Sequence, residues 1–321
     1  MPPTRVLLDT DPGIDDALSI LLALASPELH VEAITTSGGN LPVEKTTVNA
    51  LKIVELAGAI QIPVAKGVEK PLFRKRPDDP FSHGEDGLGN TFLPEPKLKL
   101  DPRNAVDVIV EKVKEFPGEL TLITTGPLTN IGLSLMKEPW IAKKIREHIL
   151  MGGIYGVTPY GYQNATGLSP VLDWNICVDP EAAKVVFHSG MEITTIGNDV
   201  TTVPSSDVKE HHITNLEKVD TPITRFAAKA MRYITQRGFI MHLHDPMAVA
   251  IAVRRDLFKF TRLRVDVETQ GELTAGQTIA DHRMRRPVVW GEEVPEVTVA
   301  TDVDGPKLID FFIERIQSMK K

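Results

Sequence analysis

Four aspartates lie within eight residues near the start of the sequence: Asp9, Asp11, Asp15 and Asp16. Like charges this close repel each other unless a cation is bound or their pKa values are spread apart. Hard cations such as calcium and magnesium bind carboxylate oxygens. Capping of the following helix would account for Asp15 or Asp16, but not for Asp9 and Asp11. The segment therefore predicts a metal site or catalytic carboxylates.

A second candidate is His244-Asp245-Pro246, which precedes an apolar helical run at residues 247–253. Aspartate before proline at the start of a helix is also a common cap, so the motif alone leaves a structural explanation open. A carboxylate cluster needs further ligands, however, and an imidazole can transfer protons at neutral pH. We interpret the nearby His242 as a packing or surface histidine.

A third candidate is the segment 124–130, Thr-Thr-Gly-Pro-Leu-Thr-Asn, at the end of a predicted strand. It is either a turn that starts a helix or a place where a backbone carbonyl binds the metal.

The elements that must position these groups alternate along the chain. Apolar runs predict strands at 5–8, 31–36, 120–124, 148–151 and 192–196, and helices at 16–24, 43–57, 105–115, 128–136 and 180–187. Such alternation is typical of an α/β fold with an open, mostly parallel sheet and helices on both faces. In such sheets ligands bind at the carboxyl ends of the strands, which is where the aspartates stand.

Two long stretches interrupt the alternation. Residues 68–102 are rich in proline and glycine, and residues 152–172 in glycine, tyrosine, threonine and proline. Loops of this length are usually functional or disordered, and both are expected over the same end of the sheet. Because we find no repeat or linker, we predict a single domain spanning residues 1–321.

The composition favours a small-molecule enzyme. The net charge of -7 over 321 residues offers no basic surface for nucleic acid. The single cysteine, Cys177, excludes an intramolecular disulfide and a cysteine-rich zinc site. No apolar run approaches the length of a membrane span, and the N-terminus lacks a secretory h-region. We therefore expect a cytoplasmic protein with neither nucleic acid nor membrane as a partner.

With these segments in view, the chain resembles the inosine-uridine preferring nucleoside hydrolases. The match begins with residues 9–17, Asp-Thr-Asp-Pro-Gly-Ile-Asp-Asp-Ala, a highly specific N-terminal motif. It continues in order through segments 34–40, 83–89, 125–130, 151–153, 175–183 and 244–246. The resemblance implies a Rossmann-like fold whose active site lies at the strand C-termini.

The resemblance also implies a reaction, hydrolysis of the N-glycosidic bond of ribonucleosides with Ca²⁺ as the cofactor. Calcium would be bound by the carboxylates of Asp11, Asp16 and Asp245 and by the main-chain oxygen of Thr125. Asp11 would also be the base that takes a proton from the calcium-bound water, and Asp9 would support the site from behind. The remaining implied roles are sugar binding by Asp15, Asn40, Asn164 and Asn175, a loop over the pocket carrying His83, and protonation or steering of the leaving base by His244.

These implied roles suit the chemistry of N-glycosidic bond cleavage. Cleavage passes through an oxocarbenium-like sugar, with an activated water on one side and a donor to the leaving group on the other. A metal lowers the pKa of its bound water, and a general base completes the proton removal.

The sequence departs from the family pattern in two places. Asp173 stands where the family usually has glutamate, and the connection from Asn164 to Asn175 is longer than expected. We expect Asp173 to reach the 5′-hydroxyl through a water or from a shifted backbone. Phe239 lies in a stretch where members with broad substrate choice often have tyrosine. Phenylalanine can stack on a base but cannot donate a hydrogen bond, so base preference stays open between inosine, uridine and other ribosides.

Two rival functions remain. A phosphatase of the haloacid dehalogenase type also starts with a strand and an Asp-x-Asp pair, but Pro12-Gly13 after that pair fits it badly. A calcium-dependent nucleoside- or ribose-binding protein without activity would be free to lose Asp11 or His244, which are both present. Finally, the resemblance implies nucleoside salvage by a homodimer or homotetramer.

Overall fold

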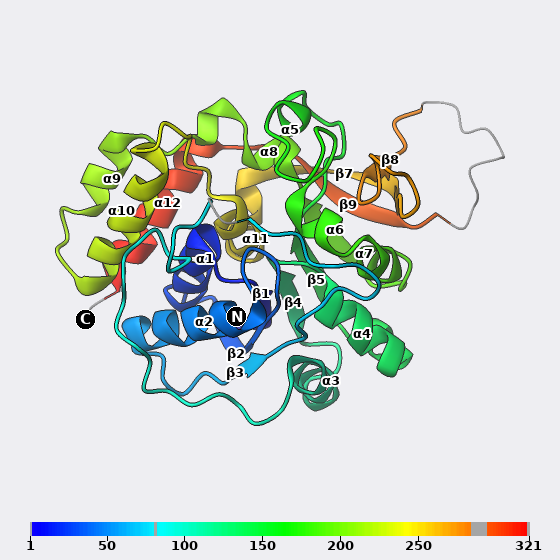
Figure 1. The fold of residues 1–321 in the computed structure, drawn as a ribbon, viewed down its shortest axis with the longest axis horizontal. Helices are drawn as coiled ribbons and strands as arrows, with labels where there is room; N and C mark the ends of the chain where they lie inside the picture. The colour runs from blue at the N-terminus through cyan, green and yellow to red at the C-terminus, as the bar shows by residue number, and fades with distance from the viewer. Residues whose placement is uncertain (1, 80–81, 284–293, 320–321) are drawn as a thin grey trace.

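A nine-stranded sheet runs through the computed structural model, which describes residues 2–79, 82–283 and 294–319 (Figure 1). Within these residues the strand order is β3-β2-β1-β4-β5-β6-β9-β7-β8. The strands are β1 Thr4–Thr10, β2 Leu29–Thr36, β3 Val64–Lys66, β4 Thr121–Thr124, β5 Glu147–Met151, β6 Ile193–Ile196, β7 Phe258–Val267, β8 Thr278–Ala280 and β9 Glu296–Val303. Strands β1 to β6 and β9 pair in parallel, whereas β7 pairs antiparallel with both β8 and β9. The predicted fold class, an open and mostly parallel α/β sheet, is confirmed.

The order of the first six strands creates a switch point between β1 and β4. From β1 the chain builds outward through β2 and β3, then returns to the other side of β1 and builds outward again through β4, β5 and β6. Ligands of open α/β sheets bind in the crevice at such a reversal. In the register, Asp9 lies beside Thr124 of β4 and Thr35 of β2. The aspartate segment and the segment after β4 therefore meet at the switch point.

Helices cover both faces of the sheet. They are α1 Ile14–Leu24, α2 Val43–Ala57, α3 Ala105–Glu115, α4 Thr129–Lys137, α5 Tyr160–Gln163, α6 Trp174–Val178, α7 Pro180–Phe187, α8 Asn198–Thr201, α9 Glu210–Leu216, α10 Pro222–Thr235, α11 His244–Val253 and α12 Gly305–Ser318. One core contains α1, α2, α10, α11 and α12, and the other contains α3, α4 and α7 (Figure 1). Side chains of a strand alternate between its faces, so Val6 and Leu8 join the first core and Leu7 the second.

The connection between β3 and α3 has no helix or strand among its described residues, in line with the loop predicted at 68–102. The loop predicted at 152–172 contains the four-residue helix α5. In the part of the chain described here, no helix has both the length and the apolar character to cross a membrane.

Candidate active site

The turn between β1 and α1 is organised by Asp16, which is fully buried. Its carboxylate accepts hydrogen bonds from the hydroxyl of Thr10 at 2.6 Å and from the backbone N–H of Gly13 at 3.1 Å. The hydroxyl of Thr125, which follows β4, donates to the same carboxylate at 2.9 Å. Asp16 thus stabilises the first turn of α1 and joins the ends of β1 and β4.

Asp11 lies in this turn with one carboxylate oxygen bonded and the other unpaired. The backbone N–H of Asn40 donates to its Oδ2 at 2.6 Å, and the Asn40 amide reaches Asp16 at 3.0 Å. Asp11 Oδ1 is buried without a hydrogen-bond partner among the described residues. A Cβ atom at Gly39 or Gly126 would come within 2.0 or 2.6 Å of the Asp11 carboxylate, so both positions need glycine. A buried, unpaired carboxylate oxygen is costly unless a ligand completes it.

Asp245 completes the acidic cluster from α11, which packs against α1. One oxygen each of Asp15, Asp16 and Asp245 lies within 4.8 Å of the others. The pKa values of Asp245 and Asp11 are raised well above the usual range, mainly by burial and also by the neighbouring carboxylates. Burial and Asp16 also raise the pKa of Asp15 to about 6. A bound cation would offset this repulsion, so the cluster could hold a metal ion.

Asp9 lies behind the cluster. Its Oδ1 accepts from Thr35 at 2.6 Å and from Asn130 at 2.8 Å, while Oδ2 is buried without a partner among the described residues. Burial raises the pKa of Asp9 to about 7, despite these two hydrogen bonds. It joins β1 to β2 and α4.

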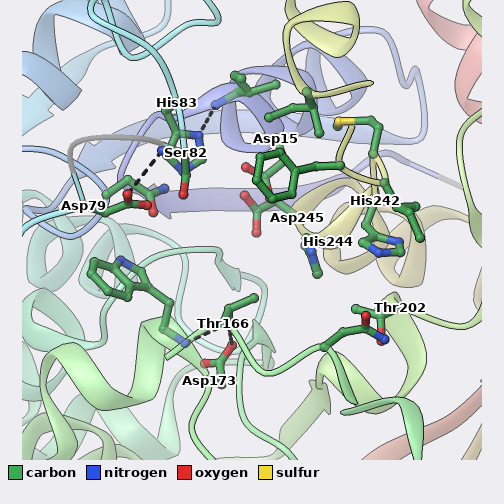
Figure 2. A pocket seen from close by; sticks show the side chains of 18 of the residues that line it. Asp15, Asp79, Ser82, His83, Thr166, Asp173, Thr202, His242, His244 and Asp245 are labelled. Carbon is green, nitrogen blue, oxygen red and sulfur yellow. Dashed lines mark hydrogen bonds between the residues drawn. The ribbon is translucent and has the colours of Figure 1, made fainter. Parts of the chain in front are cut away.

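A cavity of about 630 Å³ opens above the cluster (Figure 2). Of the residues predicted for the site, those that line it are Asp15, Asn40, His83, Thr125, Asn164, Asp173, Asn175, His244 and Asp245. Asp11 and Asp16 are not among the lining residues and are fully buried. In Figure 2, Asp15, His83 and Asp245 project from one side, and Thr166 and Asp173 lie opposite. Every residue predicted from the sequence therefore lies in the cavity wall or in the cluster of buried aspartates.

Two of the histidines that line the cavity, His244 and His83, come from different elements. His244 begins α11, and its Nδ1 lies 2.7 Å from the hydroxyl of Thr201 on α8. Burial lowers the pKa of His244 to about 3. His83 comes from the connection between β3 and α3, and its Nδ1 accepts the backbone N–H of Ile14 at 3.0 Å. That bond ties the long connection to the N-terminus of α1.

Asn164 and Asp173 already have protein partners. The Asn164 amide donates to the main-chain oxygen of Tyr160 at 3.1 Å and to the hydroxyl of Thr202 at 3.3 Å. Asp173 caps α6, where its Oδ1 accepts the N–H of Ile176 at 3.1 Å. Its burial raises its pKa. Asp173 thus has a structural role as well as a position at the cavity.

The structure corrects the interpretation of His242, which lines the cavity instead of only packing or facing solvent. Its ring stands edge-on to that of His244, with centroids 5.3 Å apart, and its Nδ1 lies 3.7 Å from Asp207. The connection between α10 and α11 also supplies Arg237, Ile240 and Met241, which belong to the stretch around Phe239 that the sequence connected with base preference. Trp174, Thr166 and Thr202 were missed on the other side. No periodic pattern marks these positions, because they lie in short helices and connections.

Comparisons with known proteins agree with this geometry. Residues 6–310 match the family model described as inosine-uridine preferring nucleoside hydrolase. The chain is 37% identical over 319 residues to a pyrimidine-specific ribonucleoside hydrolase of Salmonella arizonae, covering 97% of this chain and 98% of the relative. Its fold is similar to a plant nucleoside hydrolase, with a TM-score of 0.89 and 34% identity over 99% of this chain and 100% of the other. A purine-preferring ribonucleoside hydrolase of Gardnerella vaginalis gives a TM-score of 0.85 and 32% identity over 98% of both chains. Sequence, fold and cavity thus agree that the chain belongs to the inosine-uridine preferring nucleoside hydrolase family and is an N-glycosyl hydrolase.

Proposed function

We propose that the protein hydrolyses ribonucleosides to ribose and free nucleobase with Ca²⁺ as its metal and Asp11 as its base. The observation that carries this proposal is the fully buried Oδ1 of Asp11, which has no hydrogen-bond partner among the described residues and lies in a cluster of aspartates beneath the cavity. A carboxylate kept there without a partner suits a group that receives a proton or holds a cation.

The donor set fits a hard cation. Asp11, Asp16 and Asp245 would hold calcium through carboxylate oxygens, and Thr125 through its main-chain oxygen. Asp15 is close enough to Asp16 and Asp245 to belong to the same acidic group, so its charge supports binding of a cation. When bound, calcium supplies positive charge that keeps these carboxylates ionised and makes a water more acidic.

The protein's own residues would then share the remaining tasks. Asp11 accepts the proton of the attacking water, an effect typically worth ~10²–10⁴-fold. Asp15, Asn40 and Asn175 border the cavity around the cluster and would bind ribose hydroxyls, fixing the sugar in a reactive orientation. His244 faces the same space and would donate to the leaving base.

The other predicted residues would contact the two ends of the substrate, the 5′-hydroxyl and the base. Asn164 and Asp173 would border the 5′-hydroxyl, and His83 would close over the base from the connection before α3. The connection after α10, with Phe239 and His242, would form the base pocket. We propose inosine and uridine as the first substrates. We also propose that the enzyme is a homodimer or homotetramer that acts in nucleoside salvage in the cytoplasm. Size-exclusion chromatography with light scattering tests the assembly.

The test is release of reducing sugar from inosine, uridine, cytidine, adenosine and guanosine, each with added calcium and after chelation. Ribose release that stops on chelation and returns with calcium, but not with magnesium, supports the reaction and the metal together. Release that is indifferent to chelation would overturn the metal assignment. Absence of ribose from all five, with folded protein that binds calcium, would favour a nucleoside-binding protein instead.

A further inference from the structure

Thr201 is a buried residue that contacts a histidine of the cavity wall and has no role in the steps above. It lies on α8, directly after the carboxyl end of β6, and is fully buried. Its hydroxyl lies 2.7 Å from Nδ1 of His244. The next residue, Thr202, instead donates its hydroxyl to the carbonyl of Asn198 at 2.7 Å, the usual bond of a threonine inside a helix.

The hydrogen-bond balance of this pair fixes the direction of the bond. Within the described residues, His244 Nδ1 is the hydroxyl's only partner. A threonine hydroxyl can donate one hydrogen and accept others. If it accepted a hydrogen from Nδ1, its own O–H would be buried without an acceptor, which is costly. If it donates to Nδ1, both groups are satisfied.

We infer that Thr201 is a positioning residue that holds His244 with Nδ1 as the acceptor, so that the ring N–H is at Nε2. Because Nδ1 is bound to α8, Nε2 is the nitrogen left to face the substrate. The group opposite the leaving base is then a hydrogen-bond donor. This inference rests on the proposed role of His244 and concerns donation of a hydrogen bond, without transfer of the proton itself. Second groups that orient a catalytic histidine through its other nitrogen are a recurring arrangement.

The test compares two substrates that differ in their need for that donor. Inosine releases hypoxanthine, which is a poor leaving group, whereas 4-nitrophenyl riboside releases a stable phenolate without assistance. Thr201→Val keeps the shape of the side chain and removes the hydroxyl. We expect kcat/KM for inosine to fall about 10- to 100-fold, with little change for the nitrophenyl riboside. Thr201→Ser keeps the hydroxyl and should restore most of the inosine activity.

Thr195→Val is the matched control, because the buried Thr195 on β6 also loses hydroxyl bonds, to Tyr155 at 2.6 Å and to Gly152 at 3.3 Å. It should leave the ratio of the two rates unchanged. Equal losses on both substrates in Thr201→Val, or no loss on either, would overturn the inference. If Thr201→Val does not fold, Thr201→Ala provides the same comparison.

Failure of the inference differs from failure of the proposed function. Wild-type protein that releases no ribose from inosine contradicts both. If wild-type protein is active and His244→Ala alters the ratio but Thr201→Val does not, His244 keeps its role and only the positioning by Thr201 is refuted.

Discussion

The side-chain amide of Asn175 donates to the main-chain oxygen of Thr125 at 2.7 Å. The same amide reaches the main-chain oxygen of Met151 at 3.2 Å. One side chain therefore joins the ends of β4 and β5 and contacts the carbonyl proposed to bind calcium.

This arrangement predicts that Asn175→Asp is more harmful to stability than Asn175→Ala, although aspartate is nearly isosteric. A carboxylate has no hydrogen to offer the two carbonyls and would face them as a third acceptor. We expect the aspartate variant to lose about 1–3 kcal/mol of unfolding free energy relative to wild type. Urea unfolding in chelator, where calcium cannot compensate, measures it. Equal stability of the aspartate variant and wild type would contradict the donor assignment of this amide.

Replacement of Asp11 should change activity and stability in opposite directions. Asp11→Asn retains an acceptor for the N–H of Asn40 but removes the base and one charge of the cluster. We expect turnover of inosine to fall by at least ~10²-fold. The metal-free protein should become more stable by about 1 kcal/mol, because a buried charge has been removed. Near-normal rates would eliminate Asp11 as the base.

His244→Ala should impair nucleosides much more than an activated substrate. The loss for inosine should approach ~10²–10³-fold, the usual cost of removing one hydrogen-bond donor from developing charge. The 4-nitrophenyl riboside needs no donor and should be hydrolysed at nearly the wild-type rate. Steady-state kinetics on both substrates decide the matter, and equal losses would argue against donation to the leaving base.

The metal-free protein should lose stability as the pH rises from about 4 to 7. Burial raises the pKa of Asp15 to about 6 and of Asp9 to about 7, from an ordinary value of 3.8. The folded state therefore binds more protons than the unfolded state in this window, so raising the pH favours unfolding. Thermal melts in chelator should show a falling Tm, and calcium should raise the Tm most at the upper end.

Asp9→Asn provides the control for this pH effect. It keeps an acceptor for Thr35 and Asn130 but cannot titrate, so the Tm of the metal-free variant should fall less steeply between pH 5 and 7. An unchanged slope would mean that Asp9 does not contribute.

Asp173→Glu should separate the structural and catalytic roles of that position. The longer side chain would displace the carboxylate from the N–H of Ile176, and loss of this helix cap costs about 1 kcal/mol. Ribonucleoside hydrolysis should be kept or improved if the 5′ end of the site follows the family. Asp173→Asn, which retains the capping oxygen, is the stability control. Complete inactivity of the glutamate variant in a folded protein would mean that this end of the cavity is built differently.

The sequence was most informative where the functional residues lie close together in the sequence. The turn of residues 9–16 could be located because strand, turn and helix follow each other directly, and the alternating apolar runs predicted the sheet. Periodicity cannot state which strands pair. The placement of β4 beside β1 became apparent only in the structure.

Contacts between residues far apart in the sequence were harder to predict. His242 was misinterpreted because its position depends on how the connection between α10 and α11 folds over the cavity, and this connection has no repeating pattern. Thr201 gave no signal either, because its significance lies in contact with a residue 43 positions away. The antiparallel pairing of β7 with β9 was missed since the predicted alternation of strands and helices did not extend into that part of the chain.

Because of the strand order, the parts of the cavity wall differ in how freely their amino acids can be exchanged. The part of the cavity proposed to bind the sugar lies at the switch point, where the ends of several strands meet. Another part of the wall comes from the connection between α10 and α11, which includes the bridge between Val208 and Met241. If this connection forms the base pocket as proposed, we expect exchanges in it to alter the accepted base while the chemistry stays intact. Relatives of this chain are named for pyrimidine and for purine ribonucleosides, and we expect such differences in substrate to arise in this segment.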